Sequence, residues 1–130
     1  MKKILNSAAD YVDEMLAGLV AAHPEYYRLH GDSGKVVARA RDGSKGKVGI
    51  VTGGGSGHLP VFTGYVGEGL LDACAIGDVF ASPSAEQMAD AIRSADQGAG
   101  VLRLYGTYGG DLLNCDMAGD LVEFEGTTCT

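Results

Sequence analysis

The sequence lacks any apolar run approaching the ~20 residues that a membrane-spanning helix needs. It begins Met1-Lys2-Lys3, as some signal peptides do, but polar residues interrupt the segment that follows. Basic residues are scarce, since 10 lysines and arginines stand against 17 acidic residues and leave a net charge of −7. Nucleic acids and anionic membrane surfaces bind basic faces, so we expect no nucleic-acid partner and no membrane partner.

Cysteine is also rare, with only Cys74, Cys115 and Cys129 and no Cys-x-x-Cys pair. An odd number of widely spaced cysteines favours buried thiols over a disulfide framework and suits a reducing compartment. We therefore expect a cytoplasmic protein. No group of histidine, cysteine and acidic residues has the spacing of metal ligands, so no metal site is predicted.

Glycine, in contrast, is abundant: the 130 residues include 21 glycines, while 45% of the chain is apolar and can form a core. The length fits one domain or a piece of a larger one. The glycines cluster after apolar runs instead of recurring periodically, which excludes collagen and simple linkers. Such clusters indicate places where the backbone turns tightly or approaches another group closely.

Short apolar or β-branched runs alternate with stretches of helical periodicity. Strands are predicted at 48–51, at 72–76 with an extension through Val79 and Phe80, and at 99–105, with one edge strand at 36–38. Helices are predicted from a capping box at Ser7–Asp10 to a stop before Pro24, from Ser82-Pro83 onward, and after Asp111. This alternation predicts an α/β fold, with a mostly parallel sheet and helices on both faces.

The last two predicted helices carry apolar residues at helical spacing. Met88, Ala91, Ile92 and Ala95 mark the buried face of the first of them. The other is supported by Leu112, Leu113, Met117, Leu121, Val122 and Phe124. Residues 127–130 then follow Gly126 as a β-prone stretch of the kind that leads into another strand. We therefore expect residues 1–130 to be the front part of a longer domain.

Two glycine-rich turns, Gly53–His58 and Gly106–Gly110, each follow a predicted strand. Ligands of open α/β sheets bind at the carboxyl ends of the strands, so both turns can face one crevice. Glycine there lets backbone N–H groups point at ligand oxygens. His58 and Asp111, one on each turn, could orient or deprotonate a hydroxyl group. The pattern predicts a site for a small oxygen-rich ligand.

The standard glycine motifs do not fit the first turn. It ends in Gly57-His58 without the lysine of a phosphate-binding loop, and His58 also breaks the dinucleotide pattern and the hydrolase elbow around Ser56. A nucleotide-binding domain is therefore disfavoured. Two structural alternatives stay open: the turn as a mere tight connection, and Asp111 as a plain helix N-cap.

Several ordered segments together resemble the substrate-binding domain of dihydroxyacetone kinases. The resemblance covers nearly the whole chain, which makes it far more specific than one glycine loop. It rests on Val51–His58, Gly64–Leu71, Phe80–Ser84, Gly98–Leu102, Tyr108–Asn114 and the opening stretch with Asp13–Leu19 and His23-Pro24.

The resemblance implies phosphorylation of a short ketose at a terminal hydroxyl. It assigns His58 to substrate hydroxyls and catalysis and Asp111 to the base that activates the attacking hydroxyl. The family also traps the ketone on a second histidine, which matches no position in this sequence. The substrate-binding residues it implies are Gly54, Gly55, Ser56, Gly57, His58, Gly106 and Asp111.

The resemblance also implies that the phosphate donor is bound elsewhere. The donor is ATP on a fused domain, or a separate ADP-carrying subunit recharged by a phosphoprotein, and a homodimer is expected at full length. Gly106 and Thr107 stand where many members have Lys-Asn, which removes a cation and bulk from the pocket wall. We therefore expect a ketose slightly larger than dihydroxyacetone, such as erythrulose. A ketose-binding regulatory module without phosphoryl transfer remains the alternative.

Overall fold

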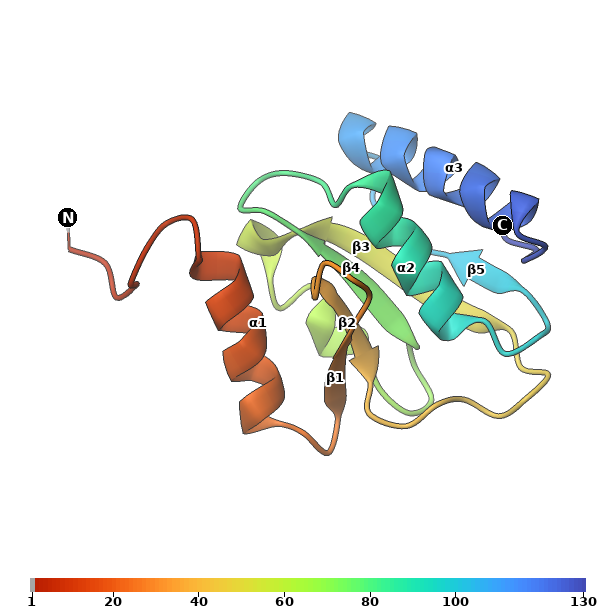
Figure 1. Cartoon of the computed structure of the whole chain (residues 1–130), viewed down its shortest axis with the longest axis horizontal. Coiled ribbons are helices and arrows are strands. Elements are labelled where there is room, and N and C mark those ends of the chain that lie inside the picture. The colour runs from red at the N-terminus through yellow and green to blue at the C-terminus, as the bar shows by residue number, and fades with distance from the viewer. Residues whose placement is uncertain (1) are drawn as a thin grey trace.

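The computed structural model describes residues 2–130 and contains three α-helices around a five-stranded sheet (Figure 1). Two 3-10 turns, Ser56–His58 and Thr63–Tyr65, lie between the third and fourth strands. The helices are α1 Tyr11–Ala22, α2 Ala85–Ala95 and α3 Gly109–Phe124, and the strands are β1 Tyr27–His30, β2 Val36–Arg39, β3 Gly49–Gly55, β4 Ala73–Gly77 and β5 Val101–Arg103.

The sheet is mixed, so the prediction of a mostly parallel sheet is wrong. The strand order is β1-β2-β4-β3-β5; β2 runs antiparallel to both β1 and β4, whereas β3 runs parallel to β4 and β5. The antiparallel half arises because β1 and β2 form a hairpin, with Gly31 and Gly34 at positive φ in its turn. The predicted edge strand at 36–38 is therefore an interior strand, and the edge is β1.

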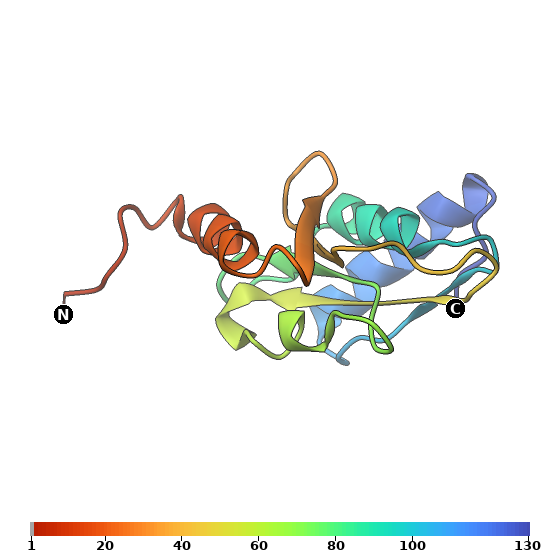
Figure 2. The same ribbon diagram turned by 90° about the horizontal axis from the view of Figure 1, so that it is seen from below.

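Side chains alternate between the two faces of the sheet and build two clusters. On one face, Val36 and Ala38 of β2 pack with Ala73 and Ala75 of β4 beneath α2 and α3. On the other, Val37, Cys74 and Ile76 pack with Val12 and Leu16 of α1. Figure 2 shows α2 on one side of the sheet and the 3-10 turns on the other. Helices thus cover both faces, as predicted.

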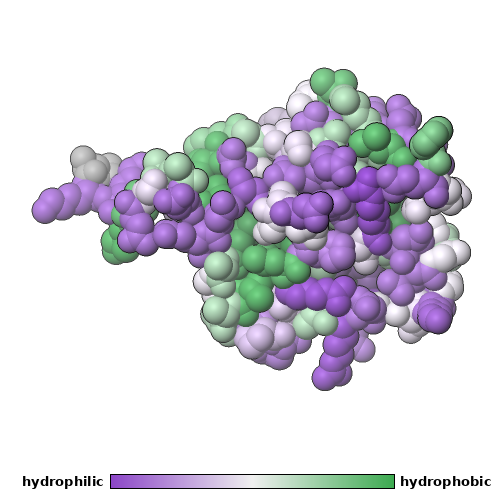
Figure 3. All heavy atoms as spheres, in the orientation of Figure 1, coloured by the Kyte–Doolittle hydropathy of each residue, from purple (hydrophilic) through white to green (hydrophobic). Residues whose placement is uncertain are grey.

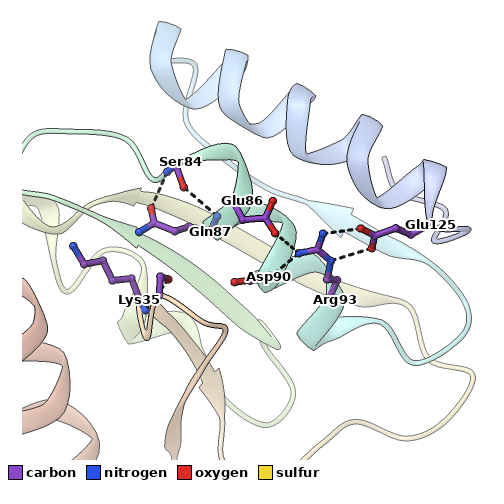
Figure 4. Close-up of polar contacts among 8 residues, drawn as sticks. Lys35, Ser84, Glu86, Gln87, Asp90, Arg93 and Glu125 are labelled. Carbon is purple, nitrogen blue, oxygen red and sulfur yellow. Dashed lines mark hydrogen bonds and ion pairs between the residues drawn. The ribbon is translucent and has the colours of Figure 1, made fainter.

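Two predicted helix starts are wrong by a few residues. Helix α2 begins after Ser84, not Ser82, because Ser84 and Gln87 exchange the two hydrogen bonds of a capping box (Figure 4). Helix α1 begins at Tyr11, and its N-cap Asp10 makes no side-chain capping bond. The strand predicted through Val79 and Phe80 ends earlier, at Gly77. These shifts leave residues 78–83 as a loop at the end of β4.

Helices α2 and α3 are tied together by an ion-pair cluster centred on Arg93 (Figure 4). Arg93 contacts Glu86 and Asp90 in its own helix and Glu125 just after α3, at 2.7–2.9 Å. The hydrogen bonds to Glu125 and Glu86 raise the pKa of Arg93 and keep it charged. The cluster fixes the C-terminal end of α3 relative to the sheet.

The predicted helix after Asp111 is present as α3, and only one side of it is buried. Asp111, Cys115, Ala118, Gly119 and Val122 are buried. Of the apolar residues that predicted the helix, only Val122 is among them; Leu112, Leu113, Met117, Leu121 and Phe124 are exposed. Apolar surface is accordingly visible along the margin of the molecule where α3 lies (Figure 3).

Residues Thr128–Thr130 run beside β5 in parallel orientation. Val101 donates to the Thr128 carbonyl, Thr130 donates to that of Val101, and Arg103 donates to that of Thr130, at 2.7–3.0 Å. The predicted β-prone stretch is therefore extended and paired. In residues 2–130, no helix is both long and apolar enough to span a membrane.

Candidate functional site

A cleft of about 450 Å³ lies at the carboxyl ends of β3 and β5. These strands are parallel, so their carboxyl ends reach the same edge of the sheet. His58 follows β3 and Asp111 follows β5, and both line the cleft, as the sequence predicted. The full lining is Gly55, His58, Val61, Phe62, Phe80, Ala81, Ser82, Gly106, Tyr108 and Asp111.

The glycines of the first turn differ in what they do. Gly53–Gly55 belong to β3 and pair with Ala75–Gly77 of β4, so the turn itself comprises only Ser56–His58. A Cβ on Gly55 would lie 3.1 Å from the Ala81 carbonyl oxygen, and one on Gly54 would overlap the ring of Phe62. Close packing explains why glycine occupies these two positions. Gly54 is not part of the cleft lining.

The Ser56–His58 turn presents its backbone at the cleft. The Ser56 N–H donates a hydrogen bond to the Asp78 carbonyl oxygen at 3.1 Å, and the Leu59 N–H donates one to the Ser56 carbonyl oxygen. The turn is a 3-10 helix in which Gly57 and His58 are exposed, and His58 lines the cleft. An exposed glycine-containing turn of this kind lets a ligand approach the backbone closely.

Two buried polar atoms on the predicted site residues lack a hydrogen-bond partner among the residues described. They are the Ser56 hydroxyl and Asp111 Oδ1, in side chains that are 7% and 5% exposed. Buried polar groups are nearly always paired, and an exception calls for an explanation such as a bound ligand. A polyhydroxy ligand can supply the missing partners of both.

The second turn presents Asp111 to the cleft. Tyr108 is the N-cap residue of α3, so Asp111 lies in the first helical turn and the N-cap alternative is wrong. A Cβ on Gly106 would lie 3.3 Å from the Tyr108 ring and 4.0 Å from Asp111 Oδ2. The absence of a side chain at Gly106 therefore opens the cleft next to the carboxylate.

Sequence reasoning missed six residues of the cleft lining: Val61, Phe62, Phe80, Ala81, Ser82 and Tyr108. The ring centroids of Phe80 and Tyr108 lie 5.8 and 6.2 Å from that of His58. The only signal was their place inside the resembling segments, because neither position stands out by composition or periodicity. Among the residues described, no group of three or more histidine, cysteine or acidic side chains could hold a metal ion.

Comparisons of the sequence with a family model and with known proteins agree on one family. The model of the Dak1 domain matches residues 17–130. The chain is 49% identical over 124 residues to the dihydroxyacetone-binding subunit DhaK of a PTS-dependent dihydroxyacetone kinase from Listeria innocua. It is 44% identical over 126 residues to a D-erythrulose kinase from Mycolicibacterium smegmatis. These alignments cover 95% and 97% of this chain.

The fold agrees with a solved relative. The crystal structure of the dihydroxyacetone kinase from C. freundii, in complex with AMP-PNP and Mg2+, matches 98% of this chain with a TM-score of 0.89 at 33% identity. The chain spans 37% of the Listeria relative, 21% of the Mycolicibacterium relative and 24% of the C. freundii chain. With residues 17–130 matched to the Dak1 domain, the chain belongs to the dihydroxyacetone kinase family.

Proposed function

We propose that this chain binds a short-chain ketose so that a terminal hydroxyl of the ketose can be phosphorylated. Two unpaired buried atoms carry the proposal: Asp111 Oδ1 in the cleft lining and the hydroxyl of Ser56, which lies between the lining residues Gly55 and His58 in the chain. A small ligand with several hydroxyls matches them. The relatives that bind dihydroxyacetone or phosphorylate erythrulose support it.

Each residue has a distinct part in the proposed site. The exposed backbone of Gly57 and His58 approaches ligand oxygens, and Ser56 adds a hydroxyl. The His58 side chain contacts a substrate hydroxyl and assists its reaction. Asp111 accepts the proton of the hydroxyl that attacks phosphorus. Phosphoryl transfer depends mostly on such positioning and on charge stabilisation, so a few groups suffice.

Gly54, Gly55 and Gly106 act in this site through their lack of a side chain. Gly55 lets the 78–81 loop approach β3, and Gly54 accommodates the ring of Phe62, which lines the cleft. Gly106 leaves the space next to Asp111 open. That space favours a four-carbon ketose such as erythrulose over dihydroxyacetone.

In the proposed reaction, another domain or subunit binds the phosphate donor. It is either ATP on a fused nucleotide-binding domain or an ADP-carrying subunit that a phosphoprotein recharges. The chain spans 37% of its Listeria relative, and residues 1–130 are proposed as the N-terminal part of a substrate-binding domain. A homodimer at full length and a cytoplasmic location complete the proposal.

Titration calorimetry of the 130-residue chain with dihydroxyacetone and erythrulose tests the binding step. The Asp111→Asn variant tests the assigned base in the full reading frame supplied with each donor. Ketose affinity should stay within about 10-fold, while phosphorylation should fall by about 100-fold or more. A matched Asp116→Asn variant, changed at an exposed position on the same helix, should retain activity.

Three results would count against parts of this proposal. Absence of ketose binding by both the chain and the full reading frame contradicts the ligand class. Ketose binding without phosphorylation under either donor indicates the regulatory alternative. A clear preference for dihydroxyacetone over erythrulose contradicts the proposed role of the open wall at Gly106.

A further inference from the structure

The backbone of Phe80 adopts a conformation that is unusual for phenylalanine. Its φ is +57°, and it is the one non-glycine residue with positive φ in the part of the chain that the structure describes. It is the third residue of a turn closed by the Ala81 N–H and the Asp78 carbonyl at 3.1 Å. Glycine or asparagine usually fills such a position, because a bulky side chain is strained there. A strained residue of this kind at a cleft points to a functional role.

The strain is not offset by burial. The Phe80 side chain is 78% exposed, although it is a large apolar residue. It takes no part in either core cluster. A phenyl ring in a strained turn and in contact with water contributes little to folding stability. The reason for its position must therefore lie in what the ring touches.

The ring touches the two residues that end the Ser56–His58 turn. A Cβ on Gly57 would lie 2.9 Å from Phe80 Cε1, so glycine at position 57 makes room for the ring. The His58 and Phe80 rings meet in a T-shaped arrangement, with centroids 5.8 Å apart and an interplanar angle of 72°. Edge-to-face contacts at such distances are favourable.

Tyr108 contacts the same imidazole and starts from the second turn. Its ring stacks on His58 with centroids 6.2 Å apart and an interplanar angle of 21°. It is also 68% exposed. Gly106 provides its space, since a Cβ there would lie 3.3 Å from Tyr108 Cδ2. Each glycine-rich turn thus accommodates one aromatic ring that contacts His58.

We propose that Phe80 and Tyr108 are positioning residues that hold the His58 imidazole in the orientation that meets the ketose. The inference rests on the proposed function for the identity of the ligand. It assigns Gly57 and Gly106 a second role, because both glycines leave space for the rings. The strained turn at Phe80 is maintained because it places a ring against the imidazole.

Pairs of variants separate the rings from the backbone. Phe80→Gly removes the ring and suits the positive φ, so the chain should keep or gain thermal stability. Phe80→Tyr keeps the ring. Tyr108→Leu and Tyr108→Phe form the matching pair. Loss of either ring should weaken ketose binding about 2- to 10-fold, and the aromatic replacements should restore it.

The ring-proton resonances of His58 report the contact directly. In Tyr108→Leu they should move toward the values of an unstacked imidazole, whereas Tyr108→Phe should leave them near the wild-type values. Unchanged His58 resonances and unchanged ketose affinity in Phe80→Gly and Tyr108→Leu would overturn the inference. If the wild-type protein binds no ketose, the proposed function fails, while the His58 resonances still decide whether the rings orient the imidazole.

Discussion

The ring of Phe62 occupies the space where a side chain on Gly54 would lie. Gly54 is buried in β3 and pairs with Ile76 of β4, so its backbone cannot easily move away. Phe62 itself packs against the cluster under α1. A methyl group at position 54 must displace the ring, and overpacking of this kind costs about 1–3 kcal/mol. Gly54→Ala should lower the free energy of unfolding by that amount in chemical denaturation.

A second substitution shows whether the overlap with Phe62 is the cause. Phe62→Leu is itself destabilising, but it shortens the side chain that meets position 54. The double variant Gly54→Ala/Phe62→Leu should therefore be more stable than the sum of the two single effects predicts. Strict additivity would contradict the packing explanation.

The unpaired hydroxyl of Ser56 leads to a prediction about stability and binding together. Because its Oγ is buried without a partner in the residues described, Ser56→Ala removes an unsatisfied group and should not lower the melting temperature. If the hydroxyl binds the ketose, its loss should weaken affinity about 2- to 10-fold. Thermal unfolding and calorimetry check the two parts. A destabilised variant with full affinity would assign Ser56 to the fold alone.

Asp72 is a buried aspartate just before β4, and its carboxylate accepts hydrogen bonds from two other residues. Its carboxylate receives hydrogen bonds from the Ile50 N–H at 2.8 Å and from Lys47 Nζ at 3.1 Å. Arg39 Nε lies 3.0 Å from it but is not aligned for a hydrogen bond, so that pair is purely electrostatic. Asp72→Asn should cost about 3 kcal/mol, with little of it from Lys47, whose side chain is 37% exposed.

Asp78 provides the matched control for Asp72. Its carboxylate also pairs with a lysine, Lys35 at 3.0 Å, but its side chain is 70% exposed. Exposed pairs contribute about 0–1 kcal/mol, so Asp78→Asn should change the free energy of unfolding far less. Equal effects of the two substitutions in urea denaturation would contradict the importance of burial.

The predictions from sequence succeeded where a local pattern determines the structure. The buried face of α2 and the strands at 48–51 and 99–105 follow from apolar spacing, and the two turns meet because β3 and β5 are parallel. The β1–β2 hairpin was missed because Tyr27–His30 is a half-polar edge strand without a clear alternation. Its antiparallel pairing depends on tertiary context.

Helix α3 and Phe80 show two further limits. Helix α3 has apolar residues on its exposed side as well as its buried side, so periodicity alone could not identify which side packs. The contact of Phe80 with His58 depends on a positive φ, which no residue preference predicts for phenylalanine. His58 and Asp111 could be found because each ends a glycine-rich segment that follows an apolar run, whereas their aromatic neighbours could not.

The pair of Arg93 with Glu125 predicts a pH dependence of stability. The hydrogen bond from Arg93 lowers the pKa of Glu125 from its ordinary value of 4.5. A carboxyl with a lowered pKa stabilises the fold above its ordinary pKa, and that stabilisation is lost as pH falls through the lowered value. Glu125→Gln should therefore melt below wild type at neutral pH, and the gap should close in acid.

Asp120→Asn is the control for this pH effect. Asp120 is an exposed carboxylate on α3 and forms no ion pair with any residue from 2 to 130. Its substitution should leave the difference in melting temperature small at every pH. A gap for Glu125→Gln that persists or widens in acid would contradict the assigned ion pair.

The exposed apolar stripe of α3 predicts self-association of the 130-residue chain. Leu113, Met117, Leu121 and Phe124 recur at spacings of four, four and three residues, so they share one side of the helix, and they are 62%, 50%, 42% and 95% exposed. Contiguous apolar surface in water favours association.

Sedimentation velocity should show self-association that the double variant Leu113→Gln/Leu121→Gln reduces, with little change in melting temperature because both positions face solvent. Glutamine adds no charge to the −7 chain, so repulsion cannot explain the effect. Asp116→Asn, on the polar side of the same helix, should leave self-association in place, whereas a monomeric wild-type chain at high concentration would show that the stripe is too small to drive it.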